Sequence, residues 1–273
     1  MISYDEACKL TPDKLIKNIF RIYQHLLTER DFWIIIVSRE GEGKSTLGQL
    51  IGALWVGVTK NPALFSVENN VYGIKQLKKL MHTRPKYSCI ESDEGSGMYM
   101  RADAMTKEGK DRKKLAWTIR SMCHLHIIAL TETGFAQVDP MLLKDRVKAV
   151  IRIPKRGRLF WYSKNKLAKI EVDRDNQCVK RWGKPNWKAS FRALPKKEYE
   201  EYNTHKRKML GTDGGQQSEK YYSVTEVAKK WMMSHEGVQK WVREKKIKAV
   251  KNPAGAYRIP EMEVNKYMPQ PVQ

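Results

Sequence analysis

Cysteine, long apolar runs and acidic residues are all scarce in this sequence. The four cysteines stand far apart and form no CxxC pair, which argues against a zinc site and suits a reducing compartment. The longest apolar run, from Phe32 to Val37, is too short to span a bilayer. The first six residues have neither the basic start nor the apolar stretch of a signal peptide. The sequence therefore predicts a soluble, cytoplasmic protein with no membrane span.

Acidic residues are outnumbered, with 30 Asp and Glu against 52 Lys and Arg, and the net charge is +22. An excess of this size usually indicates a polyanionic partner, with nucleic acid first and an anionic membrane second. The alternative is a basic protein whose charge only keeps it in solution. Hydrophobic residues make up 41% of the chain, and 273 residues leave room for one large domain and a smaller one.

Between Phe32 and Leu54, an apolar run of strand length opens into a glycine-containing loop and then into a segment with helical apolar spacing. A strand, a glycine loop and a helix that begins at a lysine and a hydroxyl residue form the layout of a P-loop. Glycines let backbone N–H groups ring a phosphate, and the helix N-terminus adds partial positive charge. The residues predicted to bind nucleotide are Ser38, Gly41, Glu42, Gly43, Lys44, Ser45 and Thr46.

Two residues of this loop carry the predicted phosphate chemistry. Lys44 is expected to reach the β- and γ-phosphates and to act in catalysis, and the Ser45 hydroxyl is expected on Mg²⁺, so the predicted cofactors are ATP and Mg²⁺. The loop departs from the GxxxxGK[ST] pattern because Ser38 stands where the pattern has glycine. The alternative is a chance glycine turn before an ordinary helix, which the flanking strand and helix disfavour.

An acidic pair follows a short strand that is expected to begin near Tyr87. Two adjacent carboxylates at a strand tip look like a Walker B motif, so Asp93 is expected in the Mg²⁺ shell and Glu94 is expected to orient or deprotonate the attacking water. Glu91 and Ser92 interrupt the apolar run that a buried parallel strand would have. Two alternatives stay open, a solvated acidic turn and a register in which Glu91 is the metal-side acid.

Further strands are expected at 126–133, with a polar tip, and at 147–153, and helical spacing is found over 15–26 and 73–81. This alternation of strands and helices predicts an α/β fold. We expect a P-loop NTPase domain with a mainly parallel sheet, flanking helices and its ligand at the carboxyl ends of the strands.

Polar residues near these strands are candidates for catalysis. Thr131 and Glu132 fall at a strand tip, where NTPases with an additional strand place a γ-phosphate sensor. Arg120, Arg146 and Arg152 are candidates for stabilising transition-state charge, in the same subunit or from a neighbouring one. Most arginines are surface residues, so a surface position is the alternative for each.

The composition changes after the predicted sheet. Residues 154–210 are expected to form a basic, β-rich extension of an ATPase domain that covers 1–210. Over 151–220, 19 Lys and Arg stand against 8 Asp and Glu, with aromatic residues interleaved. Such a surface could attract phosphates and stack on bases, and the alternative is a hairpin whose aromatics pack on the sheet edge. Residues 211–219 have the composition of a linker.

Residues 220–273 form a separate small module. Ser223 to Glu226 form a capping box before one helix, Ser234 caps a second, and a basic hairpin-like wing follows at 247–260. This order suits a helix-turn-helix in the major groove of double-stranded DNA, with the wing on the DNA backbone. The alternative is a helical protein-interaction module. The residues predicted to contact DNA are Ser234, His235, Gln239, Lys240, Arg243, Lys251 and Arg258.

The tail, through S-V-T-E-V-A-K-K-W, V-Q-K-W-V-R-E-K-K-I-K-A-V and A-Y-R-I-P, resembles the excisionase/MerR-type winged helix-turn-helix family. Residues 1–210 resemble P-loop ATPases of the FtsK/HerA group, which includes TraG-like coupling ATPases, viral packaging ATPases and zonula occludens toxin-like phage proteins. The shared features are Gly41-x-Gly43-Lys44-Ser45, Asp93-Glu94-Gly95, and Arg120 before Ile127-Ile128-Ala129-Leu130-Thr131. This resemblance implies a homo-oligomer, typically a ring hexamer, that moves DNA using ATP. The family commonly has Thr-Gln where this chain has Thr131-Glu132.

These features together predict an ATP-hydrolysing enzyme that acts on double-stranded DNA as a motor or as a packaging or transfer ATPase. Its tail would recruit it to a site on a genome, such as that of a virus or plasmid. One alternative is an ATP-dependent DNA-binding switch in replication, partition or transposition. Another is a transcription regulator whose P-loop only binds nucleotide.

Overall fold

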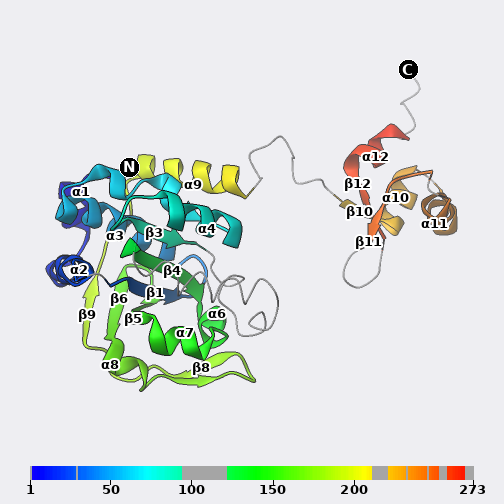
Figure 1. Ribbon diagram of the computed structural model, residues 1–273. Coiled ribbons are helices and arrows are strands. Elements are labelled where there is room, and N and C mark those ends of the chain that lie inside the picture. Colours follow the sequence, from blue (N-terminus) through cyan, green and yellow to red (C-terminus); the bar gives the residue numbers. More distant parts are fainter. Residues whose placement is uncertain are drawn as a thin grey trace. The chain divides into compact units, whose positions relative to one another are not determined.

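The computed structural model describes residues 2–28, 30–93, 122–210, 221–231, 233–244, 246–251 and 257–267. The chain divides into two compact units, Met1–Leu210 and Gly211–Gln273, and each unit is described by itself (Figure 1).

A seven-stranded sheet forms the centre of the first unit. Its strands are β1 (Phe32–Ser38), β2 (Asn70–Val71), β3 (Cys89–Ser92), β4 (Leu125–Thr131), β5 (Val147–Lys155), β6 (Arg158–Ser163) and β9 (Trp187–Ser190). They lie in the order β2-β3-β4-β1-β5-β6-β9. The strands from β2 to β5 pair parallel, whereas β6 and β9 pair antiparallel at one edge. The expected α/β fold with a mainly parallel sheet is therefore confirmed.

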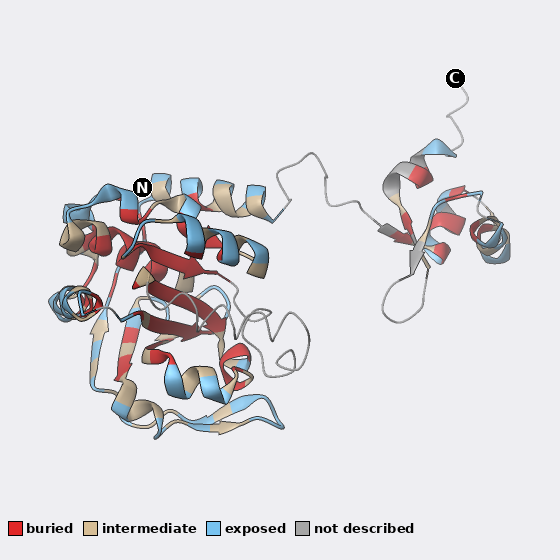
Figure 2. Ribbon diagram, viewed as in Figure 1, coloured by how far each residue is buried: buried red, intermediate tan, exposed pale blue. Residues whose placement is uncertain are grey.

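Strand β1 explains why the sheet is covered on both faces. Its apolar run continues without polar interruption, as is typical of a central parallel strand. Because successive side chains alternate between the faces, Ile34 and Ile36 join one hydrophobic core while Trp33, Ile35 and Val37 join a second core. Figure 2 shows the resulting buried sheet between helices whose outer sides are exposed.

Helices cover each face of this sheet. The core that contains Ile34 also takes residues from α1 (Tyr4–Leu10), α2 (Asp13–Leu26) and α3 (Lys44–Thr59). The core that contains Ile35 takes residues from α4 (Ile74–Thr83), α6 (Glu132–Ala136) and α7 (Pro140–Asp145). Two short 3-10 helices, η1 (Pro62–Leu64) and η2 (Val67–Asn69), lie between α3 and β2.

The stretch predicted to be a β-rich extension contains strands and also two helices. A separate hairpin is made of β7 (Glu171–Asp173) and β8 (Cys178–Arg181). Helix α8 (Lys164–Leu167) follows β6, and α9 (Lys196–Met209) follows β9. Helix α9 begins directly after Pro195 and has one buried residue, Tyr202.

In its described residues, the second unit combines three helices with a small antiparallel sheet. Its elements are β10 (Tyr221–Ser223), α10 (Val224–Trp231), α11 (His235–Arg243), β11 (Val250–Lys251), β12 (Tyr257–Pro260) and α12 (Glu261–Lys266). The strands lie in the order β10-β12-β11. The predicted capping box forms, since the amides of Ser223 and Glu226 each donate to the other residue's side chain. Val227, Val238 and Ile259 lie in a core made only of residues from this unit.

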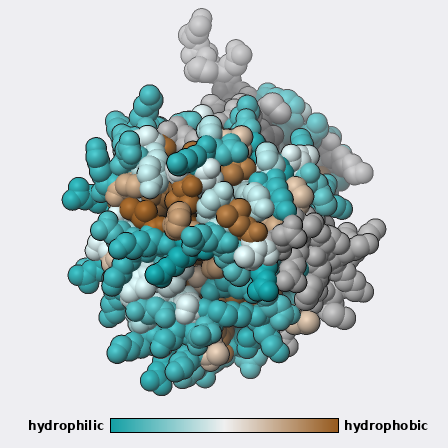
Figure 3. Space-filling model, turned by 60° about the vertical axis from the view of Figure 1, so that its left-hand side comes forward, coloured by the Kyte–Doolittle hydropathy of each residue, from teal (hydrophilic) through white to brown (hydrophobic). Residues whose placement is uncertain are grey.

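Charged and polar side chains cover much of the face of the molecule seen in Figure 3, with a smaller apolar group among them. None of the helices in the described ranges is long and apolar enough to cross a membrane.

Candidate functional site: a cavity at the carboxyl ends of three strands

The loop between β1 and α3 has the backbone shape that its glycines predict. Gly41 has φ +75° and Gly43 has φ +96°, in the left-handed region that favours glycine. Gly43 also caps α3, which begins at Lys44. The amino terminus of this 16-residue helix, with its partial positive charge, therefore faces the end of the loop.

Ser38, the departure from the P-loop pattern, is the last residue of β1. Its φ is not positive, so this position does not require glycine. Its hydroxyl donates to the carbonyl of Arg39 at 2.6 Å. The Lys44 ammonium donates to the same carbonyl at 3.1 Å and to the Ser38 hydroxyl at 3.4 Å. The serine thus helps to hold the lysine side chain over the loop.

Asp93 follows directly after β3 and is almost completely buried, with 1% of its surface exposed. The Ser45 hydroxyl donates to Oδ1 of Asp93 at 3.0 Å. The other oxygen, Oδ2, accepts from the Lys206 ammonium at 2.9 Å and from the Tyr202 hydroxyl. Burial and the charge of Asp93 raise the pKa of Tyr202, so its phenol remains a donor. The two residues predicted for Mg²⁺, Ser45 and Asp93, are therefore in direct contact.

Glu91, the alternative metal-side acid, lies on β3, two residues before Asp93. It is fully buried and accepts a hydrogen bond from Gln49 Nε2 at 2.7 Å. Burial, together with the charge of Asp93, raises the pKa of Glu91 well above its usual range. Gly48 of α3 lies against this carboxyl group, since a Cβ there would come within 1.9 Å of Oε1. Glu91 therefore faces α3 and is not among the residues that line the cavity.

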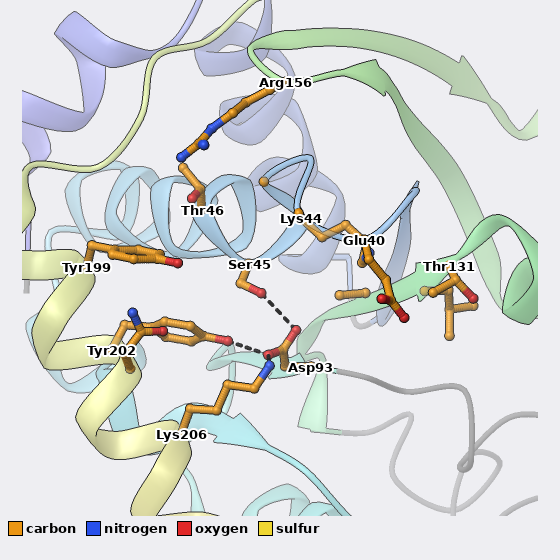
Figure 4. A pocket seen from close by; sticks show the side chains of 15 residues that line it. Glu40, Lys44, Ser45, Thr46, Asp93, Thr131, Arg156, Tyr199, Tyr202 and Lys206 are labelled. Carbon is orange, nitrogen blue, oxygen red and sulfur yellow. Dashed lines mark hydrogen bonds and ion pairs between the residues drawn. The ribbon is translucent and has the colours of Figure 1, made fainter.

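A cavity of about 420 Å³ lies at the carboxyl ends of β1, β3 and β4. Its walls carry cationic, hydroxyl, amide and carboxylate groups, which suit a ligand with charged phosphates. Figure 4 shows Tyr199, Tyr202 and Lys206 entering this space from α9. The lining side chains on which the argument rests are Glu40, Lys44, Ser45, Thr46, Asp93, Thr131, Arg156, Tyr199, Tyr202, Asn203 and Lys206.

Several predicted site residues are brought to this cavity. Gly41, Gly43, Lys44, Ser45, Thr46, Asp93 and Thr131 line it. Thr131 pairs in register with Ser38, and its hydroxyl accepts from the amide of Gly134 at 2.9 Å, so it also caps α6. Glu42 is not among the lining residues. Glu94 and Arg120 lie outside the residues that the structure describes.

Arg146 requires a correction, because the structure does not place it at the cavity. It precedes β5, whose first residues pair with the first residues of β1, so it lies at the opposite end of the sheet. There its guanidinium contacts Asp31 at 3.2 Å, and the two side chains are only 6% and 12% exposed. Arg146 is therefore paired with Asp31 and is not among the residues that line the cavity of its own chain.

Arg152 is also engaged away from the cavity lining. Its guanidinium contacts Glu132 at 3.0 Å and lies over the Trp182 ring at 4.8 Å. The glutamate that follows the predicted sensor threonine therefore faces an arginine of β5 rather than the ligand space.

Residues of α9 and the β5–β6 turn are the part of the site that sequence reasoning missed. Tyr199, Tyr202, Asn203 and Lys206 recur at intervals of three and four, which is one face of a helix. That face carries few apolar residues, so hydrophobic periodicity did not reveal it. Arg156 enters the cavity from the turn after β5.

The donor set fits a metal-bound polyphosphate. Hydroxyl and carboxylate oxygens, such as those of Ser45 and Asp93, are the protein ligands that Mg²⁺ commonly uses together with phosphate oxygens. The helix N-terminus at Lys44 supplies the partial positive charge that favours a bound phosphate.

On α11 of the second unit, most of the predicted DNA-contacting residues face outward. His235, Lys240 and Arg243 are exposed, while Val238 and Val242 are buried, as the helical spacing predicts. Ser234 caps α11 by accepting from the amide of Gly237 at 3.1 Å. Gln239 Oε1 accepts a long hydrogen bond, 3.5 Å, from Arg243. Lys251 and Arg258 belong to β11 and β12, and their side chains are outside the described part of the chain.

Comparison with known proteins gives a family for the tail. Residues 221–270 match the family model described as a helix-turn-helix domain. The second unit therefore contains a DNA-binding helix-turn-helix domain, which confirms the coarse prediction for the tail. The search against curated proteins found no match.

Solved structures give distant similarities for the chain. One is in the HORMA:CdnC:Trip13 complex of E. coli MS115-1, with 11% identity, 55% of this chain, 66% of that chain and a TM-score of 0.38. This chain thus spans just under two thirds of that one. Another is the genome packaging NTPase B204 of Sulfolobus turreted icosahedral virus 2 in complex with sulfate, with 12% identity, 50% of this chain, 92% of that chain and a TM-score of 0.36. The same NTPase in complex with ATP-gammaS is 12% identical, and the match covers 55% of this chain and 95% of that chain with a TM-score of 0.33.

Proposed function

We propose that the first unit binds and hydrolyses ATP with Mg²⁺, and that the second unit brings this activity to double-stranded DNA. The observation that carries the proposal is the contact between Ser45 and Asp93, which are 48 positions apart in sequence and 3.0 Å apart in space. They meet at the end of a glycine loop and at the start of a helix, which is the arrangement that a metal-bound triphosphate needs.

Each group of the chain has a defined task in this proposal. The loop amides and the N-terminus of α3 hold the phosphates, and Lys44 turns from the Arg39 carbonyl to the β- and γ-phosphates. When bound, Mg²⁺ supplies charge neutralisation between the phosphates, and Ser45 and Asp93 hold it. Thr131 lies at the strand tip where it can contact the terminal phosphate. Glu94, next in sequence after Asp93, is proposed as the residue that orients the attacking water.

The second unit supplies the contact with DNA. We place α11 in the major groove, with His235, Lys240 and Arg243 toward the bases and phosphates. The β11–β12 hairpin then acts as a wing on the DNA backbone, where the lysine and arginine of 251 and 258 would add phosphate contacts. The net charge of +22 supports attraction to a polyanion.

In its finer form, the proposal is a homo-oligomeric motor, such as a ring, that moves or packages DNA. A second candidate is a nucleotide-dependent DNA-binding switch that assembles without translocation. The position of α9 supports this second candidate. Side chains of α9 line the cavity and contact Asp93, and the helix ends next to Leu210, the last residue of the first unit.

ATP hydrolysis measured with and without long double-stranded DNA tests the proposal. We expect DNA to stimulate ATP hydrolysis by the unmodified protein. Lys44→Ala should lose nucleotide binding and therefore show no hydrolysis. Lys14→Ala, at an exposed position of α2, is the matched control and should behave as the unmodified protein. Normal hydrolysis by Lys44→Ala would contradict the site assignment. Displacement of a protein bound to the DNA would separate the motor from the switch.

A further inference from the structure

Helix α9 places a positive charge on the carboxylate that the proposed function assigns to the metal. Asp93 has 1% of its surface exposed, so its negative charge has little access to water. A buried carboxylate is stable only when charged or hydrogen-bonding groups surround it. Here Lys206 Nζ at 2.9 Å supplies the charge, and Tyr202 and Ser45 supply hydrogen bonds.

The two oxygens of Asp93 have different partners. Oδ1 accepts from Ser45, on the side of α3, and Oδ2 accepts from Tyr202 and Lys206, on the side of α9. Figure 4 shows all three side chains converging on the one carboxylate. A divalent cation held by Ser45 and Asp93 would therefore meet the Lys206 ammonium at the same group. Like charges at such a distance repel strongly in a site with little water.

We propose that Lys206 is the resident countercharge of Asp93 and gives way to the metal when a metal-bound nucleotide enters. This inference rests on the proposed function of the cavity. Lys206 keeps Asp93 compensated while no metal is present, so that phosphates can enter without facing a bare carboxylate. When the metal takes over, Lys206 leaves Oδ2, and the phosphates of a nucleotide bound in the same cavity would offer it a new partner of opposite charge.

The exchange has a consequence for α9, because two consecutive turns of this helix contact Asp93. Tyr202 and Lys206 are four positions apart, so they lie on one face and move together. The helix ends at Met209, and Leu210 is the last residue of the first unit. The contacts with Asp93 therefore lie within the last two turns of this helix.

The test measures the dissociation constant of mant-ATP by fluorescence, once in EDTA and once in excess Mg²⁺. The quantity compared is the dissociation constant in EDTA divided by the dissociation constant in Mg²⁺. A ratio cancels any general weakening of the site in a variant. In Lys206→Met, Asp93 keeps its hydrogen bonds from Ser45 and Tyr202 but has no countercharge when no metal is present, and the metal meets no competing ammonium group. We expect the ratio to rise about tenfold, which corresponds to about 1.4 kcal/mol. Lys206→Arg keeps the charge and should stay near the unmodified ratio.

Lys208→Met is the matched control, since Lys208 is an exposed lysine on the same helix. It should leave the ratio unchanged. A ratio that does not rise in Lys206→Met, or that rises equally in Lys208→Met, would overturn the exchange. Lys44→Ala separates the two levels of inference. If the unmodified protein and Lys44→Ala bind mant-ATP equally in Mg²⁺, the proposed function itself fails, whatever Lys206 does.

Hydrogen exchange gives a second readout that needs no catalysis. Adding Mg²⁺ with nucleotide should raise the exchange of amides within 196–209, whereas nucleotide in EDTA should not. In Lys206→Met this difference should shrink, because the helix has already lost one of its contacts with Asp93. Exchange of α9 that stays the same in both buffers would overturn its displacement by the metal.

Discussion

Mild acid should destabilise this protein through His126, which lies in the centre of the sheet. His126 on β4 has none of its surface exposed. Its Nε2 shares a 2.8 Å hydrogen bond with the Ser92 hydroxyl, and its ring lies edge-on to Trp33 with 4.5 Å between centroids. Burial lowers the pKa of His126 from its ordinary 6.5 to about 3, and His124 nearby adds to the effect.

The sign follows from comparing the two states of the chain. The unfolded chain takes up a proton at this ring below its ordinary pKa of 6.5, while the folded protein keeps the ring neutral until the pH approaches 3. The contribution is therefore fully present above pH 6.5 and is lost progressively as the pH falls. Each pH unit in this window lowers the free energy of unfolding by about 1.36 kcal/mol, so about 2 kcal/mol is lost between pH 6.5 and pH 5.

Urea denaturation of the unmodified protein and of His126→Gln, at pH 7, 6 and 5 and constant ionic strength, checks this value. The glutamine amide can hydrogen-bond Ser92 but does not titrate. We expect the variant to be less stable at pH 7 and the gap to close by about 2 kcal/mol at pH 5. The lowered pKa values of His25 and His205 affect both proteins and cancel in the difference. Parallel stability curves over this range would refute the reasoning.

Two further substitutions test the packing and the correction at the opposite end of the sheet. Gly52→Ala places a Cβ 2.1 Å from the buried Phe65 ring and should lower the free energy of unfolding by about 1–3 kcal/mol in thermal denaturation, whereas Gly73→Ala, with no atom within 4 Å, should not. An equal effect of both would contradict the overlap. Arg146→Met breaks the buried pair with Asp31 and should cost about 3 kcal/mol of stability while leaving the affinity for mant-ATP unchanged. A large loss of mant-ATP affinity in a folded Arg146→Met variant would show that Arg146 does contribute to nucleotide binding.

The parts of the fold that the sequence predicted are those specified by local patterns. β1 carries a continuous apolar run and β4 carries one over residues 127–130, because both faces of these strands are buried, and this pattern can be recognised from each segment alone. The positive φ values of Gly41 and Gly43 are likewise a local requirement. The meeting of Ser45 with Asp93 followed from topology, because the carboxyl ends of the parallel strands β1 and β3, which lie on either side of β4, share one edge of the sheet.

The parts that were missed depend on long-range contacts. Helix α9 buries one residue, Tyr202, so it lacks an apolar stripe and its polar composition is equally typical of a solvated segment. The contact of Tyr202 with Asp93 joins positions 109 apart, and the local sequence around either residue does not predict it. Arg146 was misplaced for a different reason. A residue that precedes a parallel strand must lie at the edge opposite the phosphate loop, and that rule was available from the sequence.

The charges around the cavity explain why a distant helix completes a site that the P-loop begins. In the proposed function, Lys44 and the N-terminus of α3 would act on one side of the phosphates, whereas Asp93 places a buried carboxylate on the other. A triphosphate carries several negative charges, so the carboxylate side would repel it unless a cation stands there. A P-loop and a strand-tip acid can supply that cation only by recruiting a metal. Lys206 pairs with Asp93 from within the chain, so under the proposed exchange the stability of the cavity and the entry of the nucleotide would depend on the same ammonium group.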